Sequence, residues 1–250
     1  MRHKRYLTKK CKSLEGKTVI VTGATGGIGR EICVCCLMLG ADVVMAVRNV
    51  KKGATVRESI LKRVGGDITI SELDVADFAS IDKFVENFSA PKECYLINNA
   101  GVLSERQYET NFLGTMYLSK KLEPLMKKVI FQTSISYRWR SARKDCSKVR
   151  RNMIKYAWSK RLLTQSVVAL DNPKYCLVHP GVCCTNIFPI AIGRVLARPF
   201  LHGTRTAALP AVIALTKDVP STHILAPRGF GVWGKPKLRK IHKGIYKCKN

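Results

Sequence analysis

The sequence predicts a single-domain α/β protein built on a doubly wound, parallel sheet with helices on both faces. Short β-branched segments alternate with amphipathic helical segments along most of the chain, and a glycine-rich turn joins the first strand to the first helix. Strands that alternate with helices are connected by right-handed crossovers, which produce a parallel sheet covered on both faces. The 250 residues, 46% of them hydrophobic, suffice for one such domain with a sizeable core.

The predicted elements follow one another in a regular order. Strands are expected at 17–21, 42–47, 68–73, 95–97, 129–133 and 175–178. Helices are expected at 28–39, over about 15 residues before Gly65-Gly66, and at 78–88, 110–126 and 153–170. Beyond Leu209 the sequence predicts only a helix, a weak strand and a tail.

The turn Thr22-Gly23-Ala24-Thr25-Gly26-Gly27-Ile28-Gly29 lies between the first strand and the first helix. Backbone N–H groups at a helix N-terminus in this arrangement can cradle a pyrophosphate. We expect Gly23 to permit the tight turn, Gly27 to let the backbone approach the phosphates, and Gly29 to allow close helix packing. The spacing predicts a dinucleotide site, although it differs from the common G-x-G-x-x-G pattern.

This T-G-x-x-x-G-x-G turn resembles that of the short-chain dehydrogenase/reductase family, whose fold is of the Rossmann type. Asn98-Asn99-Ala100-Gly101 follows the fourth strand and is identical to the four residues that line the cofactor site in the family. Asp74, at the end of the third strand, resembles the acid that contacts adenine there. The resemblance covers about residues 16–190 and implies an oxidoreductase that uses a nicotinamide cofactor.

Four further residues match the family's catalytic tetrad in chain order: Asn111, Ser134, Tyr156 and Lys160. Tyr156 and Lys160 are four residues apart, so they share one helix face. The resemblance implies that Tyr156 is the general acid/base, and a nearby Lys160 cation would lower the phenol pKa from its usual value of about 10. Ser134 would donate a hydrogen bond to the substrate carbonyl oxygen. Asn111 would hold a water that links Lys160 to solvent.

Two arginines favour NADP(H) over NAD(H). Arg48 ends the second strand, where an NAD-preferring protein places an acid for the ribose 2′-hydroxyl, and Arg30 follows the glycine turn. Guanidinium groups suit a 2′-phosphate because they form charge-assisted bonds with it. The cofactor residues expected in all are Gly23, Thr25, Gly27, Ile28, Gly29, Arg30, Arg48, Asp74, Asn98, Ala100, Gly101, Tyr156, Lys160, Pro180 and Gly181.

The substrate is predicted to be an apolar small molecule. The long interval from Ser134 to Tyr156 and the strand ending Ala46-Val47-Arg48 resemble the retinol dehydrogenase branch, which implies a retinoid, steroid or lipid aldehyde. The apolar segment 182–200 fits a substrate lid, and an ordinary packing segment is the alternative. Two other functions stay open: an NAD-linked dehydrogenase of small polar alcohols, and a cofactor-binding scaffold or sensor that docks on membrane or RNA.

The charge divides the chain into three expected parts. The net charge is +27 and the pI is about 10.0. We expect a basic N-terminal arm at 1–15, the enzyme domain at 16–234 and a basic C-terminal tail at 235–250; a third basic cluster lies within 138–155. Such charge favours contact with an anionic membrane surface, and nucleic acid is an alternative partner. The charge is also compatible with a solvated surface that has no dedicated partner.

The ten cysteines do not indicate a metal site. Cys33, Cys35 and Cys36 lie within one predicted helix, without a second Cys or His pair at ligand spacing. We expect reduced thiols, hence a cytoplasmic protein, with peripheral attachment to a membrane such as the cytosolic face of the endoplasmic reticulum as a variant. No signal peptide is evident, and the apolar stretch 32–47 is too short and interrupted to span a bilayer. A homodimer is left open.

Overall fold

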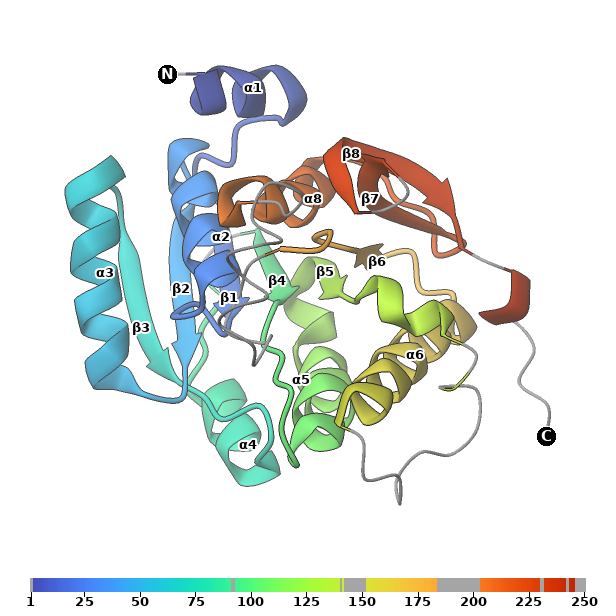
Figure 1. The fold of residues 1–250 in the computed structure, drawn as a ribbon. Coiled ribbons are helices and arrows are strands. Elements are labelled where there is room, and N and C mark those ends of the chain that lie inside the picture. The colour runs from blue at the N-terminus through green and yellow to red at the C-terminus, as the bar shows by residue number, and fades with distance from the viewer. Residues whose placement is uncertain are drawn as a thin grey trace, which may run out of the picture.

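Eight strands form one sheet in the computed structural model, in the order β3-β2-β1-β4-β5-β6-β7-β8 (Figure 1). The structure describes residues 2–90, 93–139, 141, 152–183, 203–229, 232–241 and 243–245. The first seven strands pair in parallel, and β8 is antiparallel to β7. The strands are β1 (Thr18–Thr22), β2 (Asp42–Val47), β3 (Ile68–Glu72), β4 (Cys94–Asn98), β5 (Met126–Gln132), β6 (Tyr175–Val178), β7 (His223–Gly229) and β8 (Trp233–Lys240).

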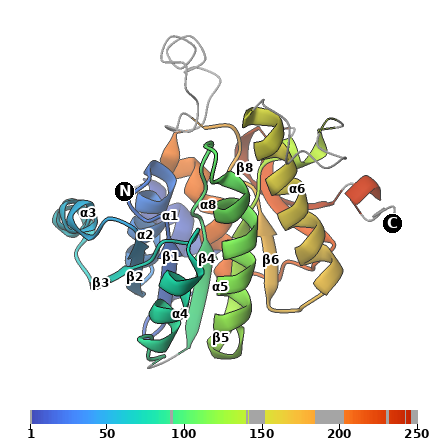
Figure 2. The ribbon, with the colours of Figure 1, turned by 90° about the horizontal axis from the view of Figure 1, so that it is seen from below.

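Helices cover both faces of the sheet (Figures 1 and 2). One face carries α2 (Gly27–Met38), α3 (Val50–Val64) and α8 (Thr204–Thr216), and the other carries α4 (Phe78–Glu86), α5 (Gly114–Leu122) and α6 (Asn152–Leu170). Short helical turns are η1 (Glu109–Leu113, a π-helix), η2 (Glu123–Leu125), η3 (Ile135–Arg138) and η6 (Lys243–Ile245). The predicted doubly wound α/β class is confirmed.

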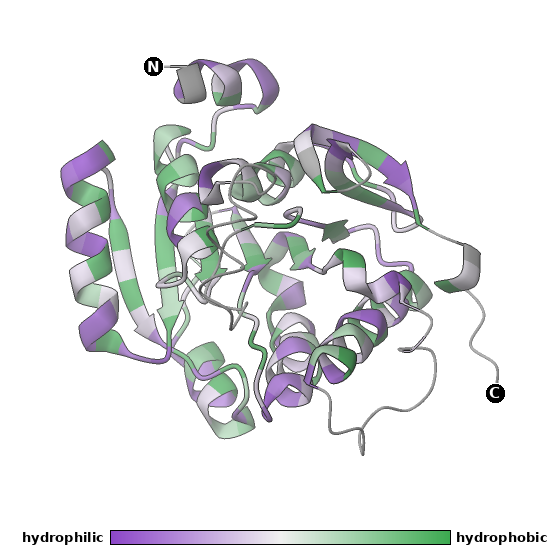
Figure 3. Cartoon of the chain, in the orientation of Figure 1, coloured by the Kyte–Doolittle hydropathy of each residue, from purple (hydrophilic) through white to green (hydrophobic). Residues whose placement is uncertain are grey.

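Two hydrophobic cores lie on the two sides of the sheet, and β1 contributes to both. Val19 and Val21 belong to the core under α2 and α8, and Ile20 to the core under α5 and α6. Successive residues of a strand point to opposite faces, so a strand buried on both sides is apolar throughout. Figure 3 shows this concentration of hydrophobic residues in the sheet and on the inner sides of the helices.

The N-terminal segment expected to be an arm contains a docked helix, α1 (Arg2–Lys10). The side chains of Leu7 and Leu14 are fully buried, and Cys11 is nearly so. These apolar residues recur at spacings of four and three, which places them on one side of the chain as it packs against the first core. The basic residues Lys4, Arg5, Lys9 and Lys10 of this helix are exposed.

The expected C-terminal tail also differs, because its first residues belong to β8. Basic side chains suit an edge strand, whose backbone pairs with one neighbour while its side chains remain largely in solvent. The predicted helix 110–126 is divided into η1, α5 and η2, and β5 begins at Met126 rather than at 129. Within the described part of the chain, no helix is both long and apolar enough to cross a bilayer.

Candidate functional site

The candidate site lies at the carboxyl ends of β1, β4, β5 and β6, beginning with the β1–α2 turn. Gly23 has φ +63°, and a Cβ at this position would lie 2.8 Å from Ala100 Cα. A Cβ at Gly29 would overlap the carbonyl oxygen of Gly23. Both positions therefore require glycine, because the turn is packed against the segment that follows β4.

The start of α2 is left open to a ligand. Its N-cap residue is Gly26, which provides no side chain to the first N–H groups, and both Gly26 and Gly27 are exposed. Thr25 is half-buried on the turn, and Ile28 is buried beneath it. Uncapped N–H groups at the positive end of a helix dipole fit an anionic group such as a pyrophosphate.

Asn99 holds this turn in place, a role that the sequence interpretation missed. Its Nδ2 donates hydrogen bonds to the carbonyl oxygens of Thr22 (2.9 Å) and Gly23 (3.2 Å), and its Oδ1 accepts one from Gln132 Nε2 (3.0 Å). Asn98, which had been expected at the cofactor, is buried and donates to Ser119 Oγ on α5 (2.8 Å). Adjacent residues at the end of a strand face opposite sides of the sheet, which explains why Asn99 faces the turn while Asn98 faces α5.

The structure brings Asn111, Lys160 and Gly101 together beside the ends of β4 and β5. A Cβ built on Gly101 would lie 3.5 Å from Asn111 Oδ1 and 3.6 Å from Lys160 Nζ. Lys160, on α6, is 4% exposed and donates to the carbonyl oxygen of Gln132 (2.8 Å). Asn111, on η1, bonds the backbone N and O of Val102 (2.8 and 3.0 Å) and donates to Ser159 Oγ (3.2 Å). Its bonds here are to protein groups, so its water-holding role stays a prediction.

Ser134 and Tyr156 form the second half of the expected tetrad. Ser134 follows β5 and caps η3, where its Oγ accepts hydrogen bonds from Ser136 N (3.3 Å) and Ser136 Oγ (3.0 Å). Tyr156, on α6, is hydrogen-bonded to Ser134. The serine after β5 and the tyrosine of α6 are thus in contact, although the sequence between them includes residues 142–151, which lie outside the described part of the chain.

The pKa values of the tetrad differ from the sequence-based expectation. Burial raises the pKa of Tyr156 to about 12, although the hydrogen bond with Ser134 acts in the opposite direction. Burial also lowers the pKa of Lys160 to about 8. The expected lowering of the phenol pKa by Lys160 is therefore wrong for the protein alone, because desolvation disfavours both charged forms.

Arg30 carries an unpaired buried atom at the start of α2. Its Nε is buried and has no acceptor among the residues described. The adjacent Glu31 is already committed, since its carboxylate accepts two bonds from Arg63 (2.7 and 2.9 Å) and lies 3.6 Å from Arg205 Nε. An orphaned guanidinium nitrogen beside an uncapped, glycine-lined helix start fits an anionic cofactor.

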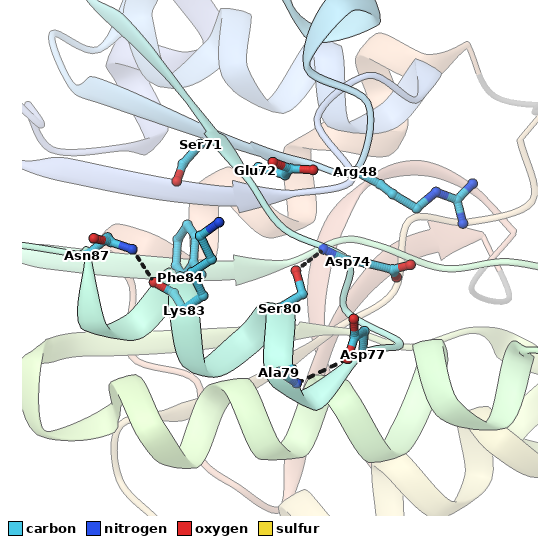
Figure 4. Close-up of a pocket in the computed structure, with 10 residues that line it drawn as sticks. All are labelled: Arg48, Ser71, Glu72, Asp74, Asp77, Ala79, Ser80, Lys83, Phe84 and Asn87. Carbon is cyan, nitrogen blue, oxygen red and sulfur yellow. Dashed lines mark hydrogen bonds between the residues drawn. The ribbon is translucent and has the colours of Figure 1, made fainter.

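Arg48 is exposed at the end of β2 and lines a cavity of about 600 Å³ between β3 and α4 (Figure 4). In the close-up, Arg48 and Asp74 lie toward one end of the cavity, and Lys83 and Asn87 toward the other. The Asp74 carboxylate accepts a bond from Ala76 N (2.9 Å) and pairs with Arg106 (3.3 Å). The other lining residues are Ser71, Glu72, Asp77, Ala79, Ser80 and Phe84.

Pro180 and Gly181 follow β6, as expected for residues at this edge of the sheet. Both are buried, and Gly181 has φ +88°. Val182 N donates to the carbonyl oxygen of Val232 (3.2 Å), which joins the end of this turn to the β7–β8 connection. The expected lid at 182–200 lies outside the described residues from 184 onward. Within the described part of the chain, no group of three or more His, Cys, Asp or Glu residues could hold a metal ion.

Comparisons with known proteins find dehydrogenases and oxidoreductases. The family model for short chain dehydrogenases matches residues 17–136. An uncharacterized oxidoreductase, YhxC, of Bacillus subtilis is 30% identical over 200 residues, which are 72% of this chain and 69% of that protein. Retinol dehydrogenase 14 of Mus musculus is 26% identical over 226 residues, 76% of this chain and 68% of the relative. Retinol dehydrogenase 11 of Homo sapiens is 41% identical over a shorter stretch of 93 residues, 36% of this chain and 29% of the relative.

Solved structures show the same fold at low sequence identity. A putative uncharacterized protein from Mycobacterium paratuberculosis superposes with a TM-score of 0.75 at 23% identity, covering 96% of this chain and 90% of the other. The active-site complex of Pseudomonas aeruginosa RhlG with NADP has a TM-score of 0.64 at 21% identity, covering 82% of this chain and 91% of the other.

Proposed function

This chain belongs to the short chain dehydrogenase family, and from that premise we propose that it is an NADP(H)-dependent oxidoreductase that interconverts a carbonyl and an alcohol on an apolar small molecule. The observation that carries the proposal is the meeting of two pairs at one sheet edge. Ser134 and Tyr156 are hydrogen-bonded to each other, and Asn111 and Lys160 both flank Gly101. A protein that only bound the cofactor would not need both pairs.

The proposed roles follow from the chemistry of each side chain. A bound nicotinamide cofactor would supply the hydride for reduction of the carbonyl. Ser134 would donate a hydrogen bond to the carbonyl oxygen, where negative charge develops. Tyr156, whose pKa of about 12 keeps its proton in place at neutral pH, would give that proton to the same oxygen. Lys160 would take part as a cation, because an anionic ligand nearby favours its charged form.

The preference for NADP(H) rests on the two arginines at the cofactor end of the site. The backbone N–H groups at the start of α2 would hold the pyrophosphate, and Gly23, Gly27 and Gly29 leave room for it. Arg30 and Arg48 would hold the 2′-phosphate of the adenosine. The orphaned Nε of Arg30 and the exposed side chain of Arg48 support this assignment.

Turnover is tested by following NADPH oxidation with a panel of apolar aldehydes and ketones. We expect Tyr156→Phe to lower kcat at least about 100-fold while NADPH affinity stays nearly unchanged, because general acid catalysis contributes about 10²–10⁴-fold. Tyr117→Phe is the matched control, since the Tyr117 hydroxyl bonds Asp82 on α4, away from the site. Turnover by Tyr156→Phe at the original rate would refute the mechanism, and NADPH binding without turnover in the unaltered protein would favour a scaffold or sensor.

Cofactor choice is tested by titrating Arg48→Ala with NADPH and NADH. A hydrogen bond to a charged group contributes about 1.5–3 kcal/mol, so NADPH binding should weaken about 10- to 100-fold while NADH binding stays within about 2-fold. Arg57→Ala removes an exposed arginine from the middle of α3 and serves as the control. Equal losses for both cofactors would show that Arg48 does not contact a 2′-phosphate.

A further inference from the structure

Two basic segments from opposite ends of the sequence meet on one side of the molecule. The Lys235 Nζ of β8 lies 5.5 Å from the centroid of the Tyr6 ring of α1. Figure 1 shows α1 and β8 on the same side of the sheet assembly. We call this region the α1–β8 surface, and its exposed residues are Lys4, Arg5, Thr8, Lys9, Lys10, Lys235, Lys237, Leu238 and Lys240.

The charge of this surface is uncompensated. Neither α1 nor β8 contains an acidic residue. The ion pairs of the described residues lie elsewhere in the molecule: Lys17–Glu93, Arg63–Glu31, Arg106–Asp74, Lys121–Asp82, Lys128–Asp218 and Arg205–Glu31. Among the described residues, seven cations of this surface have no carboxylate partner, and together they create a positive potential that attracts a polyanion.

The orientation of α1 determines how such contact is made. The apolar side of the helix faces the protein, since Leu7 is fully buried and Tyr6 packs against the first core. The basic side faces solvent, and Figure 3 shows hydrophilic residues along the outer part of α1. A docked α1 therefore cannot insert an apolar face between lipids, and the contact it offers is electrostatic.

We propose that the α1–β8 surface docks the protein on an anionic lipid bilayer. β8 is the edge strand of the sheet, so side chains from both of its faces flank a free edge. Leu238 is 40% exposed between Lys237 and Arg239, which suits an interface where charged headgroups adjoin acyl chains. Single-stranded nucleic acid would instead use open aromatic rings, and the Tyr6 ring is covered by the Lys235 ammonium. The proposal does not depend on the oxidoreductase activity.

The test is binding to vesicles of phosphatidylcholine mixed with phosphatidylserine, with phosphatidylcholine alone as the reference. Each lysine near an anionic leaflet raises the binding constant about 5-fold, so loss of three should weaken binding about 100-fold. Lys235→Gln, Lys237→Gln and Lys240→Gln are combined in one variant, and Lys4→Gln, Lys9→Gln and Lys10→Gln in a second. The control combines Lys62→Gln, Lys120→Gln and Lys127→Gln, which removes the same charge from exposed sites on α3, α5 and β5.

The expected result is binding to the mixed vesicles that falls with salt, large losses in the α1 and β8 variants, and a loss of at most about 3-fold in the control. Leu238→Ser should weaken vesicle binding but leave binding to polyuridylate unchanged. The proposal is overturned if the unaltered protein ignores the mixed vesicles at low salt, or if the control loses as much as the other two variants. Tighter binding to polyuridylate, with vesicle binding indifferent to Leu238→Ser, would assign the surface to nucleic acid instead. If the β8 variant self-associates without lipid, the vesicle binding of the α1 variant is compared with that of the control instead, and a loss no larger than that of the control overturns the proposal.

Discussion

Replacing Lys160 with methionine should stabilise the fold while removing a group proposed for catalysis. Lys160 is 4% exposed, and burial lowers its pKa from 10.5 to about 8. The unfolded chain therefore binds a proton more tightly than the folded chain does. Below about pH 8 the folded protein carries the full cost of the buried charge, and between about pH 8 and 10.5 stability rises with pH as that cost is relieved. Methionine has a similar length and no charge to bury.

The magnitude follows from the pKa difference. The change from 10.5 to about 8 corresponds to about 3 kcal/mol at neutral pH. The substitution also leaves the carbonyl oxygen of Gln132 without its 2.8 Å donor, which costs about 1–3 kcal/mol. Lys160→Met should thus gain about 1 kcal/mol in the free energy of unfolding near neutral pH. At about pH 9 the cost of the buried charge in the wild type falls to about 2 kcal/mol. The stability gain of Lys160→Met over the wild type should therefore be about 1 kcal/mol smaller at about pH 9 than at neutral pH, which leaves it near zero.

Urea denaturation of both proteins at about pH 7 and about pH 9, followed by circular dichroism, measures this difference. The comparison between the two proteins cancels the contributions of the buried tyrosines and cysteines, which titrate in both. Lys120→Met, at an exposed position on α5, is the control, and its difference in stability from the wild type should be the same at the two pH values. A stability difference between wild type and Lys160→Met that is the same at the two pH values would refute the reasoning.

Three further predictions concern packing and buried charge. Gly114→Ala should cost at least about 3 kcal/mol in urea denaturation, because its Cβ would overlap the carbonyl oxygen of Val75. Gly203→Ala, whose Cβ would have no described neighbour within 4 Å, should cost less than about 1 kcal/mol. Glu31→Gln should lower the free energy of unfolding by about 2–4 kcal/mol, since it leaves Arg63 and Arg205 without their carboxylate, and a thermal midpoint equal to that of the wild type would contradict this. Arg161→Met should speed proteolysis near the C-terminus, because Arg161 donates to the carbonyl oxygens of Tyr137 (3.1 Å) and Gly244 (2.8 Å); an unchanged cleavage pattern would argue against that attachment.

The parts of the fold that could be predicted are those encoded by local pattern. β1 and the start of α2 follow from a β-branched run and glycines whose backbone positions no other residue would fit. The parallel pairing of β1 to β6 follows from the alternation of strands and helices, which requires crossover connections. The sequence does not predict α1, because charged residues dominate the segment. Its packing depends on Leu7 and on Cys11 and Leu14 just after the helix, all three of which are buried.

The details of the site depend on contacts that a sequence does not display. The sequence prediction assigned Asn98 to the cofactor site, but Asn99 is the residue that contacts the β1–α2 turn. Which of the two faces the turn depends on where β4 ends, and the predicted strand ended one residue before the observed end at Asn98. The raised pKa of Tyr156 depends on burial within the folded chain and, to a lesser extent, on an electrostatic effect of Cys183, which follows β6. Spacing along one helix predicts that Tyr156 and Lys160 are neighbours, but it cannot predict how dry their surroundings are.

The π-helix η1 has a consequence for how this segment tolerates insertions and deletions. A π turn holds one more residue than an α turn, and η1 carries Asn111 and continues directly into α5, whose Leu118 and Leu122 are fully buried in the second core. Each residue advances a helix by about 100°. Deletion of one residue within Glu109–Leu113 would let the segment become a regular helix, but either Asn111 or the two leucines would then turn away from their partners. The length of this segment therefore couples the site to the core. A single-residue insertion or deletion within it would displace either Asn111 or the buried leucines of α5.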